Sequence, residues 1–268
     1  MRGPVGESFQ TIAVEALGDN VETVVLDRPQ AANALNTQMG RDLISYFESL
    51  SFEPDRARCV VLTGRGERAF CAGGDLKERD GMSTERWRAQ HLVFERMARA
   101  ILHCPTPVVA AVNGAAFGGG CEIAALCDFI YASERARFAL TETSLGIIPG
   151  AGGTQTLARA LGERRAKELI FTARIFSARE ALEWGLVNEV HPHEALAGEA
   201  LRAAKRVAAA APIAVRQAKQ AIARGLQMSI SDGMAFEIEA YNRLVPTEDR
   251  VEGVRAFNEK RRPAFKGA

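Results

Sequence analysis

Residues 113–122 read Asn-Gly-Ala-Ala-Phe-Gly-Gly-Gly-Cys-Glu, and the rest of the chain is organised around this stretch. The valine-rich run at 107–112 precedes it and is typical of a short buried strand. A helical pattern begins directly after the glycines. A glycine turn between strand and helix points free N–H groups of the first helical turn at a ligand, and the helix dipole favours negative charge there. Glu122 falls in that turn, so the stretch predicts a pocket with a carboxyl group beside it.

The glycine turn alone is also compatible with phosphate binding, or with tight packing that serves only the fold. The chain contains no GxxxxGK[ST] sequence, which argues against a nucleoside triphosphate site. Gly118-Gly119-Gly120 does not match GxGxxG, which argues against a dinucleotide site. At this point a structural role and a ligand-binding role both stay open.

Composition excludes several classes of protein. The chain has 268 residues, with 47% hydrophobic and 25% charged residues, as in ordinary globular proteins. Its net charge of +1 gives no bulk field that would attract nucleic acid or an anionic membrane. The apolar runs are too short to span a bilayer, and the opening residues Met1–Glu7 lack an apolar signal region. We therefore expect a cytoplasmic protein without a membrane or nucleic-acid partner.

Cysteine and histidine spacing indicates neither a disulfide framework nor a metal site. The cysteines are odd in number and irregularly spaced, so we expect reduced thiols. Two of them lie in glycine loops, but no histidine is near them in sequence, which argues against a catalytic cysteine. The histidines lack the spacing of metal ligands. These residues are Cys59, Cys71, Cys104, Cys121 and Cys127, and His91, His103, His191 and His193.

Strand and helix patterns alternate as far as about residue 190, which indicates an α/β fold with helices covering a sheet. A run of helical patterns follows, with apolar residues that need cover from the core or from another subunit. We expect strands at 9–15, 21–26, 59–63, 107–112, 128–132 and 186–190, and near Phe138. We expect helices at 37–50, 84–103, 153–160, 163–172, 178–184, 195–210, 213–224, 230–243 and 248–259, and a further one beginning at Asp75.

Five motifs in this order and spacing resemble the crotonase, or enoyl-CoA hydratase/isomerase, superfamily over essentially the whole chain. They are Asp27-Arg28-Pro29 with Asn33-Ala34-Leu35, Ala69 to Leu76 (AFCAGGDL), Gly118 to Glu122 (GGGCE), Glu142 to Gln155 with its glycines, and Phe257 to Arg261 (FNEKR). The resemblance implies a spiral of ββα turns that holds the active site, residues 1–193, and a C-terminal helical oligomerisation region, residues 194–268. It also implies a homotrimer or a dimer of trimers.

The resemblance further implies an acyl-CoA thioester as substrate. The backbone N–H groups of Gly74 and Gly119 match the family's pair of donors to the thioester oxygen. Glu122 and Glu142 match the two glutamates of hydratases, and we assign Glu122 as the base toward water and Glu142 as the proton donor to carbon. Neighbouring carboxyl groups disfavour joint ionisation, so one can stay protonated. The implied reaction is syn addition of water across the 2,3 double bond, and coenzyme A is part of the substrate, so no separate cofactor is expected.

Contacts to coenzyme A are also implied by the resemblance. Gln30 stands where many relatives have lysine, which removes one expected phosphate contact. Phe257 and Lys260 match positions that reach the coenzyme A of a neighbouring subunit. The full set of candidate contacts is Arg28, Ala32, Ala34, Ala72, Asp75, Leu76, Lys77, Phe257 and Lys260.

Three rival functions remain to be weighed. Family isomerases generally lack the glutamate that matches Glu122, so its presence favours a hydratase over a Δ3-Δ2 isomerase. Strings such as Leu76-Lys77-Glu78-Arg79 look closest to the methylglutaconyl-CoA hydratase branch, some of whose members bind RNA through a lysine-rich helix. The corresponding helix at 37–50 has Arg41 and no lysine, which argues against RNA binding. No serine lies in a nucleophile elbow, which argues against a serine hydrolase.

Overall fold

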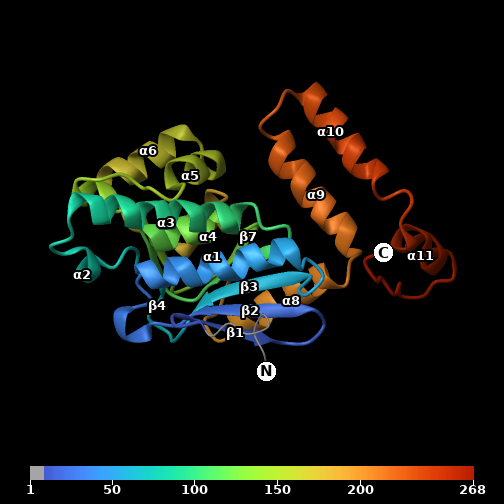
Figure 1. Ribbon diagram of the computed structural model, residues 1–268, viewed down its shortest axis with the longest axis horizontal. Helices are drawn as coiled ribbons and strands as arrows, with labels where there is room; N and C mark the ends of the chain where they lie inside the picture. Colours follow the sequence, from blue (N-terminus) through green and yellow to red (C-terminus); the bar gives the residue numbers. More distant parts are fainter. Residues whose placement is uncertain (1–8) are drawn as a thin grey trace.

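The computed structural model describes residues 9–268, and the opening segment Met1–Glu7 lies outside these residues. The fold is built on two sheets with helices around them, so the expected α/β class is confirmed (Figure 1). The larger sheet has six strands in the order β1 (Ile12–Ala16), β2 (Val21–Leu26), β3 (Cys59–Gly64), β5 (Val108–Val112), β7 (Phe129–Ser133) and β10 (Glu189–His191).

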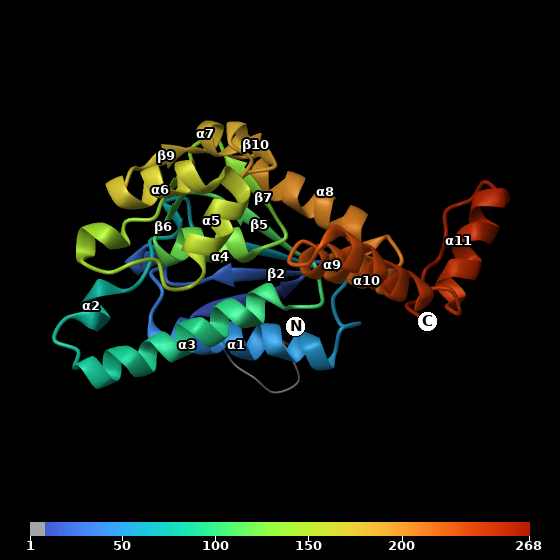
Figure 2. The ribbon, with the colours of Figure 1, turned by 90° about the horizontal axis from the view of Figure 1, so that it is seen from above.

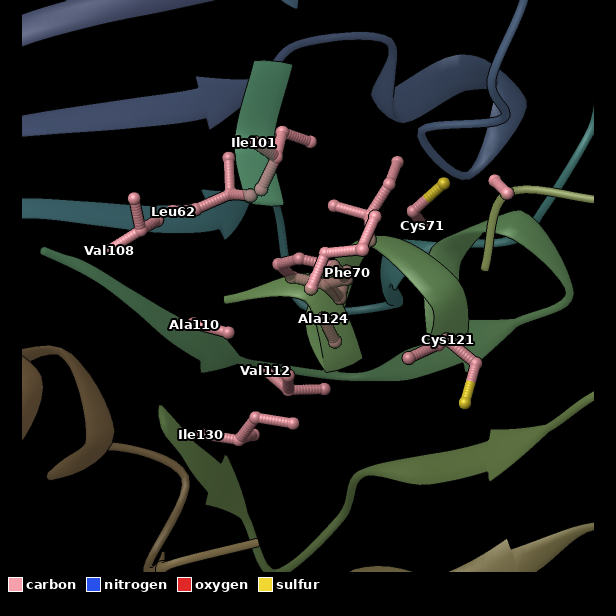
Figure 3. Packing of buried hydrophobic residues seen from close by; sticks show 14 of the residues in the cluster. Leu62, Phe70, Cys71, Ile101, Val108, Ala110, Val112, Cys121, Ala124 and Ile130 are labelled. Atoms are coloured by element: carbon pink, nitrogen blue, oxygen red, sulfur yellow. The ribbon is translucent and has the colours of Figure 1, made fainter. Parts of the chain in front are cut away.

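The larger sheet is buried on both faces, as its strands of nearly continuous apolar residues require. β1 and β2 form the expected antiparallel hairpin, and all the other strand pairs of this sheet are parallel. Alternate residues of β5 go to opposite faces: Val108, Ala110 and Val112 belong to the main core, whereas Val109 and Ala111 belong to a second cluster. Figure 3 shows the first three residues along one strand, near Leu62 and Ile130 of its neighbours.

Helices cover the two faces of this sheet differently. The main core is closed by α1 (Thr37–Phe52), α3 (Thr84–Leu102) and α4 (Gly119–Leu126), which contribute buried residues such as Phe47 and Met97. The second face is covered by α8 (Leu196–Ala208), whose alanines pack against β3, β5 and β7. The first C-terminal helix is therefore packed on the sheet.

The smaller sheet consists of β4 (Ala69–Cys71), β6 (Ala115–Phe117), β8 (Arg137–Ala139) and β9 (Phe176–Ser177). Sequence periodicity indicated only the strand near Phe138. The other three strands have two or three residues each, and two of them lie inside segments that read as glycine loops. Strands this short show no period. β10 also begins three residues later than the strand expected at 186–190.

The remaining helices agree with the sequence patterns to within a few residues. α2 (Leu76–Arg79) begins directly after Asp75, whose carboxylate accepts hydrogen bonds from the backbone N–H groups of Lys77 and Glu78 as its N-cap. A 3-10 turn, η2, carries Glu142. The others are η1 (Pro29–Ala31), η2 (Glu142–Leu145), α5 (Gly153–Leu161), α6 (Glu163–Thr172), α7 (Ala178–Glu183), α9 (Pro212–Gly225), α10 (Ile230–Asn242) and α11 (Glu248–Asn258).

The last three helices project from the body of the molecule. α9 and α10 pack against each other as an antiparallel pair, and α11 lies at the opposite end of the molecule from α2 (Figures 1 and 2). Many large apolar side chains on them are exposed. They include Ile222, Leu226, Met228, Ile230, Met234, Ile238, Tyr241, Val254 and Phe257. Among residues 9–268, no helix combines the length and the apolar composition needed to cross a bilayer.

Candidate active site

The glycine stretch forms a sharp turn between β6 and α4. Gly118, the N-cap of α4, has φ +49°, a backbone conformation that favours glycine. A Cβ atom on Gly120 would lie only 2.1 Å from the carbonyl oxygen of Cys71, so α4 packs directly on the end of β4. The turn therefore holds the first residues of α4 beside the loop that follows β4.

In the part of the chain that the structure describes, two N–H groups that donate no backbone hydrogen bond meet at this point. The N–H of Leu35 donates a hydrogen bond to the Gly73 carbonyl oxygen, and the N–H of Asp75 donates one to the Leu35 carbonyl oxygen. Because Gly74 lies between these two residues, its own N–H faces away from Leu35. A Cβ atom on Gly119 would lie 3.9 Å from the Gly74 nitrogen. Within residues 9–268, neither the Gly74 nor the Gly119 amide donates a backbone hydrogen bond. Both residues line one cavity, which gives an oxygen with developing negative charge two donors.

Glu122 lies in the first turn of α4 and is 3% exposed. Its Oε1 atom accepts hydrogen bonds from the backbone N–H groups of Ala151 at 2.7 Å and Gly153 at 2.8 Å. These donors come from the second glycine-rich segment, which folds over α4. Burial raises the pKa of Glu122, while these N–H groups act in the opposite direction because they stabilise the carboxylate.

Glu142 lies in η2 with 8% of its surface exposed, on the same cavity as Glu122. Within residues 9–268, its buried Oε2 atom has no hydrogen-bond partner. Burial and then repulsion from Glu122 raise the pKa of Glu142 to about 7, and the nearby charge of Arg79 opposes this rise. The geometry thus favours an ionised Glu122, held by backbone donors, beside a Glu142 that keeps its proton more readily.

The cavity shared by these groups has a volume of about 900 Å³. Its polar part holds both glycine amides and both glutamates, and the rest of its wall is mainly apolar. The apolar part includes Leu35, Leu76, Trp87, Leu92, Phe94, Leu145, Ile147, Ile148 and Pro149. The sequence prediction brought Gly74, Gly119, Glu122 and Glu142 together from four separate positions, and the structure places all four on this one cavity.

The predicted coenzyme A contacts divide into three groups. Ala72 and Leu76 line the cavity, and Lys77 lines a smaller hollow next to it. Arg28 bridges two loops, because its Nη1 atom lies 2.9 Å from Asp75 Oδ2 and 2.6 Å from the carbonyl oxygen of Ala34, and its contact with coenzyme A stays a prediction. Together with the bond from Ala72 N–H to the Ala32 carbonyl, these contacts fasten the two loops to each other. Arg28, Ala32, Ala34 and Asp75 thus hold the Gly74 loop in place.

Phe257 and Lys260 are not brought to this cavity. They lie at the end of α11, which the two views place far from α2 and the start of α3 (Figures 1 and 2). Phe257 is 84% exposed. Their predicted contact with a neighbouring subunit's coenzyme A stays a prediction.

Sequence reasoning missed several cavity residues on α2 and α3. Trp87, His91 and Glu95 all line the cavity, and their spacing of four residues puts them on one face of α3. That spacing was the available signal. The His91 ring lies so close to Gly150 that a Cβ there would be 2.4 Å from His91 Cε1. Arg79, at the end of α2, also lines the cavity and had no periodic signal in so short a helix.

Cysteine and metal chemistry find no support in the described residues. Cys71 and Cys121 lie close to the cavity wall, but both are fully buried. Burial raises the pKa of the Cys71 thiol to about 11 and that of Cys121 further, so neither is a ready nucleophile. Among residues 9–268, all five thiols are free, and no three His, Cys, Asp or Glu side chains group as metal ligands.

Comparison with known proteins gives concordant matches. Residues 17–268 match the family model described as enoyl-CoA hydratase/isomerase. A Bacillus subtilis protein named putative enoyl-CoA hydratase/isomerase YngF is 47% identical over 93% of this chain and 95% of its own length. The short-chain-enoyl-CoA hydratase of Clostridium acetobutylicum is 43% identical over 90% of this chain and 92% of its own.

A solved structure agrees with these relatives. The crystal structure of an enoyl-CoA hydratase from Bacillus anthracis superposes with a TM-score of 0.94 at 45% identity, covering 97% of this chain and all of that one. The expected spiral fold is therefore confirmed, and the cavity described above lies within that fold.

Proposed function

Since this chain belongs to the enoyl-CoA hydratase/isomerase family, we propose that its cavity adds water syn across the 2,3 double bond of an enoyl-CoA thioester. The chain is an enoyl-CoA hydratase, a carbon–oxygen lyase that yields a 3-hydroxyacyl-CoA. One observation carries the assignment of the site: within residues 9–268, two N–H groups that donate no backbone hydrogen bond line the same cavity as two buried carboxyl groups.

The proposed reaction uses these four groups as follows. Glu122, as carboxylate, takes a proton from water while the water oxygen bonds to C3 of the acyl group. The electrons of the double bond form a new C2–H bond with the proton of Glu142. Charge that develops on the thioester oxygen during this transfer is held by the N–H groups of Gly74 and Gly119. Coenzyme A is part of the substrate, so the reaction needs no cofactor.

Assignment of the two roles rests on the contacts of the carboxyl groups. The two N–H donors at Glu122 Oε1 stabilise the ionised form that a base needs. Glu142 has an unpartnered buried oxygen and a raised pKa, which suits a proton donor. An isomerase would need one proton-transferring carboxyl group, whereas this cavity is lined by two buried ones, Glu122 and Glu142.

Replacement of Gly119 tests the donor pair. Gly119 is the first residue of α4, where proline is tolerated, so Gly119→Pro removes the N–H with little damage to the helix. We expect kcat for crotonyl-CoA hydration to fall roughly 10²–10³-fold, as for loss of one such donor elsewhere. Gly119→Ala is the matched control, because it keeps the N–H and its Cβ would make an ordinary 3.4 Å contact with Leu35. Equal turnover by both variants would refute the donor role.

A carboxylate-bearing acyl group is the second proposal, and it rests on Arg79. This side chain lines the cavity, and within residues 9–268 no carboxylate forms an ion pair with it. Burial lowers the pKa of its guanidinium, and the charges of Glu78, Glu142 and Glu122 oppose this, although none of the described carboxylates is close enough to be its ion-pair partner. A substrate carboxylate would supply that partner, in keeping with the branch that the sequence resembles.

Kinetics with two thioesters check this second proposal. We expect Arg79→Met to lower kcat/KM for glutaconyl-CoA at least tenfold more than for crotonyl-CoA, because only the former carries a second anionic group. Arg86→Met, on an exposed part of α3, is the control for loss of a positive charge. Equal losses for the two substrates would show that Arg79 acts on the glutamates rather than on the acyl group.

Assembly and location complete the proposal. A homotrimer, or a dimer of trimers, would cover the exposed apolar residues of α9 and α10. A cytoplasmic location suits five cysteines that stay free thiols in the described chain. We propose no nucleic-acid partner, in line with the net charge of +1.

A further inference from the structure

A group of shared side chains, with Arg79 and Trp87 among them, lies between the main cavity and a second hollow. This hollow has a volume of about 430 Å³ and lies among α2, the start of α3 and the segment after Glu142. Arg79 and Trp87 line both spaces, together with Leu76, Leu145 and Ile147. Neither glutamate lines the second hollow. The shared side chains therefore form a wall, with the reacting groups on one side of it only.

The central part of this wall is a stacked pair. The guanidinium carbon of Arg79 lies 4.4 Å from the centroid of the Trp87 ring and 5.5 Å from that of Phe94. A guanidinium over an aromatic face is held by electrostatic attraction as well as by contact. Both partners are partly buried, and both line the cavity.

A buried amide fixes the position of Arg79. Its Nε atom donates a 2.9 Å hydrogen bond to Oε1 of Gln90, which is only 4% exposed. The Nε2 group of Gln90 donates to Thr37 Oγ1 at 2.9 Å and to Glu78 Oε2 at 2.8 Å. Gln90 thus joins α1, α2 and α3, and any rotation of Arg79 away from Trp87 would break this network.

The wall also lies close to where the acyl chain must run. Arg79 Nη1 would be 3.2 Å from a Cβ atom on Gly74, the residue proposed to bind the thioester oxygen. Leu145 and Ile147 lie three and five residues after Glu142, the proposed donor to C2. Carbons beyond C3 of the substrate must therefore extend toward the pair or turn away from it.

We propose that the Arg79–Trp87 pair, fixed by Gln90, sets the length of acyl chain that this enzyme accepts. This inference rests on the proposed hydratase function. A short chain ends against the pair. A longer chain would have to enter the second hollow, which requires the pair to separate. Trp87 and Arg79 are thus specificity-determining residues, and Gln90 is a positioning residue that acts through Arg79.

A chain-length series tests the proposal. Hydration rates are measured for straight 2-enoyl-CoA thioesters of four to twelve carbons, with the full-length enzyme. For the wild type we expect kcat/KM to fall as the acyl chain becomes longer. Trp87→Ala should raise the kcat/KM for the ten-carbon substrate, divided by that for the four-carbon substrate, roughly tenfold or more, because misfit of one methylene already costs about tenfold in an apolar pocket. Gln90→Leu should shift the ratio in the same direction, and Trp87→Phe, which keeps a ring under Arg79, should restore the wild-type profile.

Controls separate this inference from the function on which it depends. Arg86 precedes Trp87 on an exposed part of α3, so Arg86→Ala should leave the chain-length profile of kcat/KM unchanged. If the Trp87→Ala variant does not fold, the Arg79→Ala variant is measured in its place, because it removes the other side chain of the same pair. An unchanged length profile in the folded variants, with crotonyl-CoA still hydrated, would overturn the proposed wall. A wild type that hydrates no thioester would instead overturn the hydratase function.

Discussion

Glu122 and Glu142 occupy one cavity but have different surroundings. Glu122 is anchored by two backbone N–H groups from the loop over α4, whereas Glu142 has one carboxyl oxygen without a partner in the described chain. Each carboxylate disfavours ionisation of the other, so the pair titrates as a coupled unit. The pH dependence of the enzyme should therefore reflect both groups.

The pH profile of hydration is predicted to be bell-shaped. The pKa of Glu142 is raised to about 7, so kcat/KM should fall as pH rises through that value and the proton donor ionises. The pKa of Glu122 is raised above its usual range, so activity should also fall at acidic pH as the base becomes protonated. Initial rates with crotonyl-CoA between pH 5 and 9 measure both limbs. A rate that still rises above pH 8 would contradict the role of Glu142.

The same raised pKa predicts an effect on stability. Glu142 has a folded pKa of about 7 against an ordinary value of 4.5, so the folded state is destabilised progressively as pH rises from 4.5 through 7. At about 1.4 kcal/mol per pKa unit, the effect above pH 7 is on the order of 3 kcal/mol. Glu142→Gln should lose most turnover yet raise the thermal midpoint at pH 8 more than at pH 5. Glu122→Gln should also lose turnover. Its gain in stability should be smaller than that of Glu142→Gln, because the substitution removes a carboxylate that accepts two backbone hydrogen bonds.

Sequence alone identified the catalytic candidates but not their neighbours. Glu122, Glu142, Gly74 and Gly119 stand in motifs, which a single chain displays directly. The spacing of His91 with Trp87 and Glu95 shows that they share a face of α3, but neither that spacing nor the short helix that ends at Arg79 shows that the face lines a cavity. Their position depends on how α2 and α3 pack against the segment at 147–151, which sequence patterns do not show.

At the scale of elements, the contact between α4 and β4 places the donor pair. α4 approaches so closely that only glycine fits at position 120, next to the Cys71 carbonyl. β4 continues into the loop that carries Gly74, and α4 begins at Gly119. The distance between the two N–H groups thus depends directly on this contact.

Gly120→Ala should therefore damage both stability and catalysis. The added Cβ would lie 2.1 Å from a backbone oxygen, which cannot move like a flexible side chain, so α4 must shift. Overpacking of this kind costs about 1–3 kcal/mol or more, and we expect a lower thermal midpoint together with a reduced kcat. Gly119→Ala, one residue away, meets only the Leu35 side chain at 3.4 Å and should melt close to the wild type. A Gly120→Ala enzyme with normal midpoint and kcat would show that the helix has room to adjust.

Element boundaries followed from sequence wherever the elements were long. α1, α3 and the helices from α5 onward were expected within a few residues, since each shows several turns of apolar periodicity. β4, β6 and β9 were missed because they are too short to show a period of two. These three strands form most of the second sheet, and two of them precede the Gly74 loop and the Gly118 turn.

At the scale of the whole molecule, the C-terminal helices leave large apolar side chains exposed in a single chain. α9 and α10 cover each other along one side only, and they leave residues such as Leu226 at 78% and Ile230 at 83% exposure. Exposed apolar patches of this extent are typical of interaction surfaces. A second copy of the chain is the partner that the family resemblance implies.

Solution mass tests the proposed assembly. Light scattering after size exclusion should give three or six times the 29.0 kDa of one chain. Leu226→Asp, which puts a charge on the exposed apolar surface, should shift the protein toward smaller species. Glu237→Gln, an exposed polar change on α10, should not. A wild type that runs as a monodisperse single chain would contradict the trimer and leave the exposed helices unexplained.

The sequence by itself determined the class of fold and the order of its longer elements, and its resemblance to a known family assigned the four residues proposed to perform the reaction. It could do so because glycine turns, strand alternation and helical periods are local, and because the motifs stand in a fixed order. The tertiary structure alone decided that Gly74 and Gly119 line one cavity, that the Oε2 atom of Glu142 has no hydrogen-bond partner among residues 9–268, and that Arg79 and Trp87 line two cavities. These are distances between segments far apart in the chain, and they are set by packing of the two sheets and their helices.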